Sequence, residues 1–130
     1  MLAINPPAPA TAPTCTIVEV VRANAQTHPE KLALVCDDIS ISWGEFDQQI
    51  NKIANLLLSM GVAKGDNIAI ISPNSIPYAA LFMGILRAGA CVTPLSTMAS
   101  PDALRKMLTD CDAKAIFVAA QYLDLVEGFV

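Results

Sequence analysis

The stretch that decides the fold is Ile85-Leu-Arg-Ala-Gly-Ala-Cys-Val-Thr-Pro-Leu-Ser96, in which an apolar helix ends at Gly89 and a short buried strand follows. Glycine readily adopts the left-handed conformation that ends many helices, and proline lacks the N–H that would continue a strand ladder. Upstream, residues 65–66 predict a turn, residues 67–71 a buried strand, and residues 72–75 a loop that carries the cap of the helix. The unit is therefore strand, helix, strand.

The residues downstream repeat this alternation. Ser100, followed by proline at the first helical position, predicts a helix that continues through Asp110, and residues 115–118 predict a further strand. Residues 122–127 predict the start of one more helix. Strands that alternate with helices of ten or more residues form parallel sheets, so we expect an α/β fold with a Rossmann-like, three-layer parallel sheet and crossover helices.

A helix and a short β-hairpin are expected to precede this sheet. Apolar residues from Ile17 onward share one helical face until His28, which stands before a proline and so avoids helical backbone. Residues 32–36 and 39–41 predict two strands around a turn at residues 37–38.

The helix that follows the hairpin has the clearest start and stop signals. Ser42 and Glu45 have the spacing of a capping box, and Ile41 with Phe46 has the spacing of a hydrophobic staple. Gly61 predicts the stop. Apolar residues of this helix share one face, namely Phe46, Ile50, Ile53, Ala54 and Leu57.

Composition indicates part of a larger molecule. Hydrophobic residues make up 54% of the chain and charged residues only 15%, whereas about 25% charged is typical. The helix at residues 75–88 is apolar on all sides and needs cover on all sides. We expect residues 1–15, rich in alanine and proline, to form a disordered tail, and residues 16–130 to be an incomplete N-terminal subdomain of a larger fold.

Charge and cysteine content exclude several classes of function. The net charge of -4, without any basic cluster, argues against nucleic acid and anionic membrane surfaces as partners. The longest apolar stretch, residues 79–86, is far below the roughly 18 residues of a membrane span. The four cysteines are far apart and are expected to be buried, reduced thiols of a cytoplasmic protein.

Five motifs in the same order resemble the adenylate-forming (AMP-binding) enzyme superfamily, most of all its acyl-CoA synthetases. The resemblance runs from about Thr16 to the end of the chain and covers nearly everything but the tail. Ser96 after Leu95 favours a CoA ligase over a peptide-synthetase adenylation domain, where the resemblance would lead us to expect aspartate. The motifs are His28-Pro-Glu-Lys-Leu-Ala-Leu34, Ile41-Ser-Trp-Gly-Glu-Phe46, Gly61-Val-Ala-Lys-Gly-Asp66, Leu86-Arg-Ala-Gly-Ala90 and Thr93-Pro-Leu95.

This resemblance implies a parent enzyme that uses ATP and magnesium to convert a carboxylic acid to an acyl-adenylate and then transfers the acyl group to coenzyme A. The matching motifs hold the scaffold in that family, whereas its phosphate loop, ribose-binding acid and mobile lysine belong to later segments. No glycine-rich phosphate motif occurs in this chain. We therefore expect no catalytic residue, no metal ligand and no bound cofactor in these 130 residues alone. Their partner would be the remainder of the same polypeptide.

One loop keeps a candidate binding role. Ser96 and Thr97 follow the carboxyl end of a predicted parallel strand, the edge at which open α/β sheets bind ligands. In the family that the chain resembles, the matching loop lies near the path by which coenzyme A enters. Ser100 has a sufficient role as a helix cap, and His28, the only histidine, is expected to be a solvated turn residue.

A second class of function fits the same composition. The chain could be a complete, non-catalytic α/β interaction module whose exposed apolar helix at residues 75–88 docks a partner or a second copy. Size-exclusion chromatography with a hydrophobic dye distinguishes the two hypotheses: a tight monomer that binds no dye favours the independent module, whereas dye binding or irregular association favours part of a larger protein.

Overall fold

The computed structural model describes residues 15–128, so nearly all of the expected tail, residues 1–14, lies outside the described residues. The elements follow the expected order of a helix, a hairpin and alternating helices and strands. They are α1 (Ile17–Thr27), β1 (Leu32–Cys36), β2 (Ile39–Ser42), α2 (Trp43–Ser59), β3 (Asn67–Ile71), α3 (Ile76–Arg87), β4 (Cys91–Pro94), α4 (Pro101–Asp110), β5 (Ala113–Val118) and a 3₁₀ helix η1 (Ala120–Leu125).

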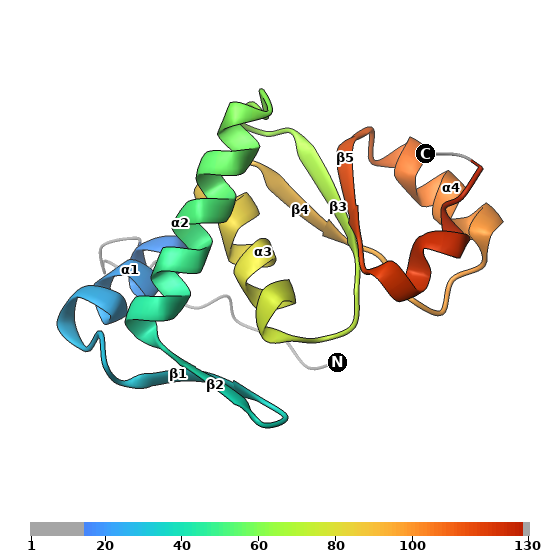
Figure 1. The fold of residues 1–130 in the computed structure, drawn as a ribbon. Helices are drawn as coiled ribbons and strands as arrows, with labels where there is room; N and C mark the ends of the chain where they lie inside the picture. Colours follow the sequence, from blue (N-terminus) through green and yellow to red (C-terminus); the bar gives the residue numbers. More distant parts are fainter. Residues whose placement is uncertain (1–14, 129–130) are drawn as a thin grey trace, which may run out of the picture.

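Three parallel strands form the central sheet in the order β4-β3-β5. Helices α2 and α3 lie on one side of it, and α4 with the 3₁₀ helix lies on the other (Figure 1). Strand β3 is central because residues 68–71 are apolar without interruption, as a strand covered on both faces requires, and all four are buried. The three-layer parallel sheet predicted from the sequence is confirmed.

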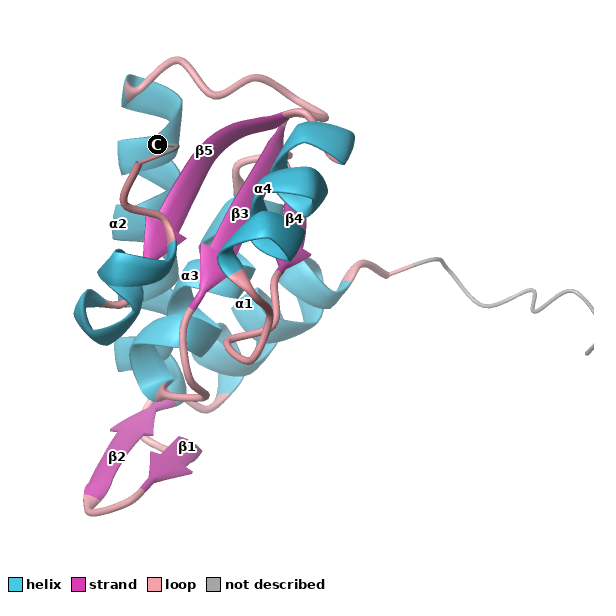
Figure 2. Ribbon diagram, turned by 90° about the vertical axis from the view of Figure 1, so that its right-hand side faces the viewer, coloured by secondary structure: helices cyan, strands magenta, loops and turns pink. Residues whose placement is uncertain are grey.

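The β1–β2 hairpin stands apart from this sheet, beyond the end at which the parallel strands finish (Figure 2). Its inner face contributes Leu34 and Ile41 to a core with α1, α2 and α3, and Phe46 packs in the same core. The capping box at Ser42 is present, since Ser42 N–H donates to Glu45 Oε2 at 2.8 Å and Glu45 N–H donates to Ser42 Oγ at 3.3 Å. The expected cap and staple thus join α2 to the hairpin.

Helix α3 is covered within the chain. Pro77 is its only exposed residue, because α2 packs along one side of the helix and the sheet along the other. Gly84 allows the close approach of α2, since a Cβ built on it would lie 2.5 Å from Ile53 Cγ2. The burial expected of an apolar helix is observed within the chain itself, while docking through this helix stays a prediction.

A nearly buried ion pair joins the same two helices. Arg87 Nη2 lies 2.7 Å from Asp47 Oδ1, with the two side chains 5% and 19% exposed. Arg87 Nη1 also donates to Asn51 Oδ1 at 2.8 Å, and Asn51 Nδ2 donates to Asp47 Oδ2 at 3.2 Å. Because Asp47 and Arg87 are removed from water, each depends on the other for compensation of its charge.

Glycines end both helices as expected. Gly89 has φ +83° and follows α3, and Gly61 has φ +81° and follows α2. In each case the amide of the next residue bonds back across the helix end, from Ala90 N–H to Ile85 O and from Val62 N–H to Leu57 O. The abrupt stop after α3 is what allows β4 to begin at Cys91.

Two expectations need correction. Residues 120–125 form a 3₁₀ helix instead of the start of an α-helix, because the segment has no side-chain cap and begins immediately after β5, where Ala119 N–H is held by Ile71 O at 2.8 Å. The cysteines are free but not buried: Cys15 and Cys91 are exposed, and Cys36 and Cys111 are half-buried. They occupy ends of elements, where the apolar packing expected for them is incomplete.

No helix among residues 15–128 combines the length and apolar character needed to cross a membrane.

Candidate functional site

The carboxyl edge of the sheet is the first place to seek a ligand site. The chain passes from β3 to β4 on one side of it and then, through α4, to β5 on the other. Helices α3 and α4 consequently lie on opposite faces (Figure 1). Such a reversal opens a crevice at the carboxyl ends of the two diverging strands, here β3 and β5.

A cavity of about 370 Å³ lies at this position, in the size range of small-molecule sites. It is bounded by the ends of β3 and β5, the loop after β3 and the first turns of α3. Its lining is mostly apolar and consists of Ile70, Ser72, Pro73, Ser75, Pro77, Tyr78, Leu81, Phe117, Val118 and Ala119.

The polar groups of this cavity are few and uncharged. Ser75 Oγ accepts from Tyr78 N–H at 3.1 Å as the N-cap of α3, and Ser72 Oγ donates to Pro73 O at 3.1 Å. None of the described lining residues carries a charge. The cavity can therefore accommodate an uncharged apolar group, but none of its described lining residues is a cation that would stabilise a phosphate.

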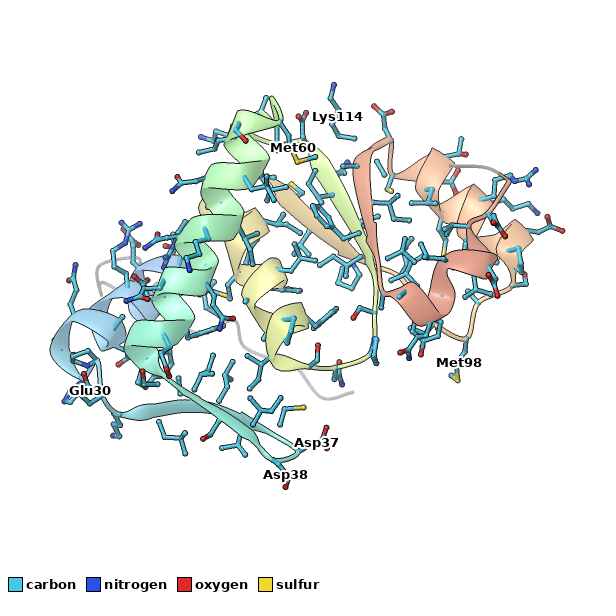
Figure 3. The ribbon with its side chains drawn as sticks, viewed as in Figure 1. Glu30, Asp37, Asp38, Met60, Met98 and Lys114 are labelled. Atoms are coloured by element: carbon cyan, nitrogen blue, oxygen red, sulfur yellow. The ribbon has the colours of Figure 1, made fainter. Side chains whose placement is uncertain are left out.

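Ser96 and Thr97 lie on the same edge, after β4, but they do not line this cavity. Ser96 is exposed, and its Oγ accepts from Met98 N–H at 3.2 Å within a local turn. Thr97 is half-buried, and Met98, 93% exposed, points away from the fold (Figure 3). The two predicted residues thus share one accessible loop outside the lining of the cavity.

The opposite, amino edge of the sheet carries a polar hollow lined by Asp66, Asn67, Asp112 and Lys114 among others. Two of its polar groups are engaged locally, since Asp66 Oδ2 accepts from Ala63 N–H at 2.8 Å and Asn67 Nδ2 donates to Cys111 O at 2.6 Å. Figure 3 shows Lys114 and Met98 at opposite ends of the sheet.

Other candidate residues have structural roles. Within residues 15–128, histidine, cysteine and acidic side chains form no group of three that could hold a metal ion. His28 is exposed at the end of α1, as predicted, with its Nδ1 2.8 Å from Thr27 Oγ1. Asp37 and Asp112 occupy turns with φ of 52° and 49°, so the turn expected at residues 37–38 is confirmed.

Comparison with known proteins shows which family the chain belongs to. The model of the AMP-binding enzyme family matches residues 21–128, from within α1 to beyond the 3₁₀ helix. The chain belongs to the AMP-binding enzyme family. The resemblance of its five motifs to adenylate-forming enzymes is thereby confirmed.

Curated members of the family include ligases that act on fatty acids and synthases of peptides. A long-chain-fatty-acid–CoA ligase of Mycobacterium tuberculosis is 26% identical over 84% of this chain, which covers 22% of that protein. A dimodular nonribosomal peptide synthase of Bacillus subtilis is 27% identical over 82% of this chain, which covers 4% of it. The chain therefore spans about a fifth of the length of the ligase, and identity alone does not favour one branch.

Solved structures agree with the fold. The fatty acyl CoA synthetase of Mycobacterium tuberculosis has a TM-score of 0.79 and 26% identity, with 86% of this chain and 23% of that chain covered. The layered α/β arrangement is thus that of the N-terminal part of adenylate-forming enzymes.

The apolar cavity was missed by sequence reasoning. Its formation depends on β5 lying beside β3 instead of beside β4, and no local pattern specifies that order. A signal was nevertheless present, because a helix start with Ser75, Pro77 and Tyr78 directly after a buried strand indicates a loop at a carboxyl edge.

Proposed function

We propose that this chain is the N-terminal scaffold of an AMP-forming acyl-CoA synthetase. The observation that carries the proposal is the match of residues 21–128 to the AMP-binding enzyme family together with structural likeness to a fatty acyl CoA synthetase. The parent enzyme would activate a carboxylic acid with ATP and magnesium and would transfer the acyl group to coenzyme A.

The scaffold by itself does not catalyse this reaction. An acyl-adenylate forms only where donors and cations stabilise the charge that develops on the α-phosphate. The cavity at the carboxyl edge has only hydroxyl groups, and the cationic Lys114 lies at the other end of the sheet. The charged groups needed for catalysis would come from the remainder of the polypeptide.

Further proposals concern the loop after β4 and the setting of the protein. Ser96 and Thr97 would lie near the path of coenzyme A, which their position on an accessible loop at the ligand-binding edge supports.

Residues 16–130 would form part of one N-terminal domain in a cytoplasmic enzyme. Pairing of two copies through exposed apolar surface would be tested by sedimentation of the isolated chain.

The decisive experiment places this scaffold inside an active relative. Residues 16–128 replace the matching segment of the Mycobacterium tuberculosis fatty acyl CoA synthetase, and acyl-CoA formation is measured with long-chain fatty acids and with aromatic acids. We expect the chimera to form acyl-CoA, whereas the relative with that segment deleted should not.

The isolated 130-residue chain provides the second arm. It should show no ATP–pyrophosphate exchange with any acid tested. Exchange by the isolated chain would contradict the scaffold role, and a chimera that is folded by circular dichroism but inactive would contradict the family function proposed for the chain.

A further inference from the structure

A second cavity, of about 250 Å³, lies between the β1–β2 hairpin and the early turns of α2 and α3. We call it the hairpin cavity. Its lining comes from the inner face and turn of the hairpin, from Gln49 of α2 and from residues 75–77 at the start of α3. It shares only Ser75 and Pro77 with the 370 Å³ cavity, so the two cavities adjoin at the first turn of α3 and are otherwise separate.

The floor of the hairpin cavity is preformed. Ile41 and Ile76 are 8% and 6% exposed and belong to the core that joins the hairpin to α2 and α3. The turn beside them is fixed by the cap of α3, in which Ser75 Oγ accepts from Tyr78 N–H at 3.1 Å. A ligand would therefore meet apolar side chains that the core already holds in place, which lowers the entropic cost of binding.

The rim of the hairpin cavity is exposed apolar surface. Ile39 lines the cavity but is 64% exposed, because it begins β2 at the free end of the hairpin, beyond the core. Alternation along β1 places Cys36 on the cavity side and Val35, 62% exposed, on the opposite face. An apolar group in the cavity would bury part of Ile39 and would leave Val35 unchanged.

One exposed carboxylate borders this apolar surface. Asp37 is the only charged residue among the described lining residues, and Cys36 Sγ lies 3.9 Å from Asp37 Oδ2. Asp38 adds a second negative charge outside the lining, and Figure 3 shows both aspartates at the free end of the hairpin. The remaining polar side chains, those of Gln49 and Ser75, carry no formal charge. The cavity entrance therefore repels an anion and attracts a cation.

We propose that the hairpin cavity binds a small organic cation, with its apolar body against Ile39, Ile41 and Ile76 and its ammonium group beside Asp37. A volume of about 250 Å³ is below the roughly 300–1,000 Å³ of sites for drug-sized molecules, so the ligand has the size of one aromatic ring with a short amine chain. Because an exposed ion pair contributes little affinity, apolar contact supplies most of the binding and the carboxylate supplies selectivity. This site goes beyond the proposed scaffold function and does not depend on it.

Titration of the full 130-residue chain with phenethylammonium chloride, followed by amide NMR, tests the site. An ionic strength of about 0.15 M screens charges that lie more than about 8 Å apart. The amide signals of Asp37, Gln49 and Ile76 should shift and saturate with a dissociation constant of about a millimolar. The uncharged 2-phenylethanol, which has the same ring and chain length, should bind about threefold more weakly, and phenylacetate should bind more weakly still.

Two pairs of variants locate the ligand. Asp37→Asn removes the charge but suits the φ of 52°, which asparagine tolerates, and it should weaken phenethylammonium binding about threefold without changing that of 2-phenylethanol. Asp38→Asn, outside the lining, should weaken it by less than about 1.5-fold.

Ile39→Ser removes apolar contact and should weaken both probes about threefold or more, whereas Val35→Ser, at a similarly exposed position on the opposite face, should change neither. If a variant does not fold, the comparison of phenethylammonium with 2-phenylethanol on the unchanged chain remains a sufficient test of selectivity.

Three results would overturn the proposal. Shifts that do not saturate would show that the cavity holds no defined ligand. Equal affinities for phenethylammonium and 2-phenylethanol would show that it does not select a cation, and saturable shifts confined to Phe117 and Val118 would place the ligand in the 370 Å³ cavity instead. Because none of these readouts involves ATP or acyl transfer, failure here is distinct from failure of the chimera to form acyl-CoA.

Discussion

The two flanks of β3 are built from the same kinds of element, but only one is closed. On the closed flank, which comprises α2, α3 and β4, the helices meet at Gly84 and the strand edge is blocked by Pro94. On the open flank, β5 has hollows on both faces and an outer edge without a partner among residues 15–128. The two flanks therefore differ in the pairing of their outer strand edges and in the hollows beside β5.

The apolar character of α3 is satisfied within the chain. The helix is covered by α2 and by the sheet, so its composition alone does not require a partner. Large apolar side chains are exposed on other elements, among them Leu56, Leu58 and Met60 at the end of α2. Ile116, Phe117 and Val118 of β5 are half-buried, as are Val92 and Thr93 of β4. The uncovered apolar surface thus lies outside α3, whereas the sequence suggested that helix.

One of the two largest effects is expected at the ion pair of the closed flank. Asp47→Ala leaves the 5%-exposed Arg87 without compensation for its charge and should lower the free energy of unfolding by about 3–5 kcal/mol. Urea unfolding followed by the fluorescence of Trp43, the only tryptophan, measures it. Asp124→Ala, on the exposed 3₁₀ helix, is the matched control and should change stability by less than about 0.5 kcal/mol.

The double variant Asp47→Leu/Arg87→Met separates charge from packing. Replacing both charges by apolar groups should recover most of the loss, because an intact buried ion pair contributes little beyond an apolar pair. If the double variant is as unstable as Asp47→Ala, the pair contributes through its geometry and the charge argument fails.

The next effect is expected where α2 and α3 touch. In Gly84→Ala the new Cβ would lie 2.5 Å from Ile53 Cγ2 and 2.7 Å from Ile53 Cβ, so the helices must move apart. We expect a loss of about 1–3 kcal/mol in unfolding free energy despite the better helix propensity of alanine. Ile53→Ala in the same chain should restore part of the loss, and independent, additive losses in the two variants would contradict a direct clash.

Local patterns in the sequence predicted the closed flank well. Gly61 and Gly89 marked helix ends that the structure confirms, and the Ser42–Glu45 spacing marked a capping box that is present. These features depend on a few neighbouring residues, so periodicity and turn chemistry suffice to find them. A second capping box, Thr16 with Glu19, had the same spacing and was overlooked.

The open flank could not be predicted in the same way. Whether β5 joins β3 or β4 depends on contacts between segments more than 40 residues apart in sequence, such as Asn67 Nδ2 with Cys111 O. The cavity at the carboxyl edge exists only because of that order. The candidate residues Ser96 and Thr97 were placed on the correct edge of the sheet, but their role in binding remains a prediction.

A pair of phenylalanines tests the comparison of flanks directly. Phe46 is 4% exposed in the closed core, and the substitution Phe46→Ala should lower the free energy of unfolding by about 3–5 kcal/mol. Phe117→Ala, on the half-covered β5, should cost about 1–2 kcal/mol because part of its ring already faces solvent. Equal losses in urea unfolding would mean that the open flank is as tightly packed as the closed one. In the chimera with the fatty acyl CoA synthetase, the cost of Phe117→Ala should rise toward that of Phe46→Ala.

The smallest effect is expected at the first turn of α1, where Glu19 is exposed. The backbone N–H of Thr16 donates to Glu19 Oε2 at 2.7 Å and the Thr16 hydroxyl donates at 2.8 Å, and these bonds hold the pKa of the Glu19 carboxyl below its ordinary value of 4.5. Since the folded-state pKa is the lower one, the ionised carboxylate stabilises α1 above pH 4.5, and this contribution is lost as the pH falls through the folded-state value.

Glu19→Gln keeps an acceptor but cannot ionise, so its urea midpoint should differ from that of the unchanged chain at pH 7 and converge with it at acidic pH. Curves that stay parallel down to pH 3 would show that the capping bonds do not discriminate between the two protonation states.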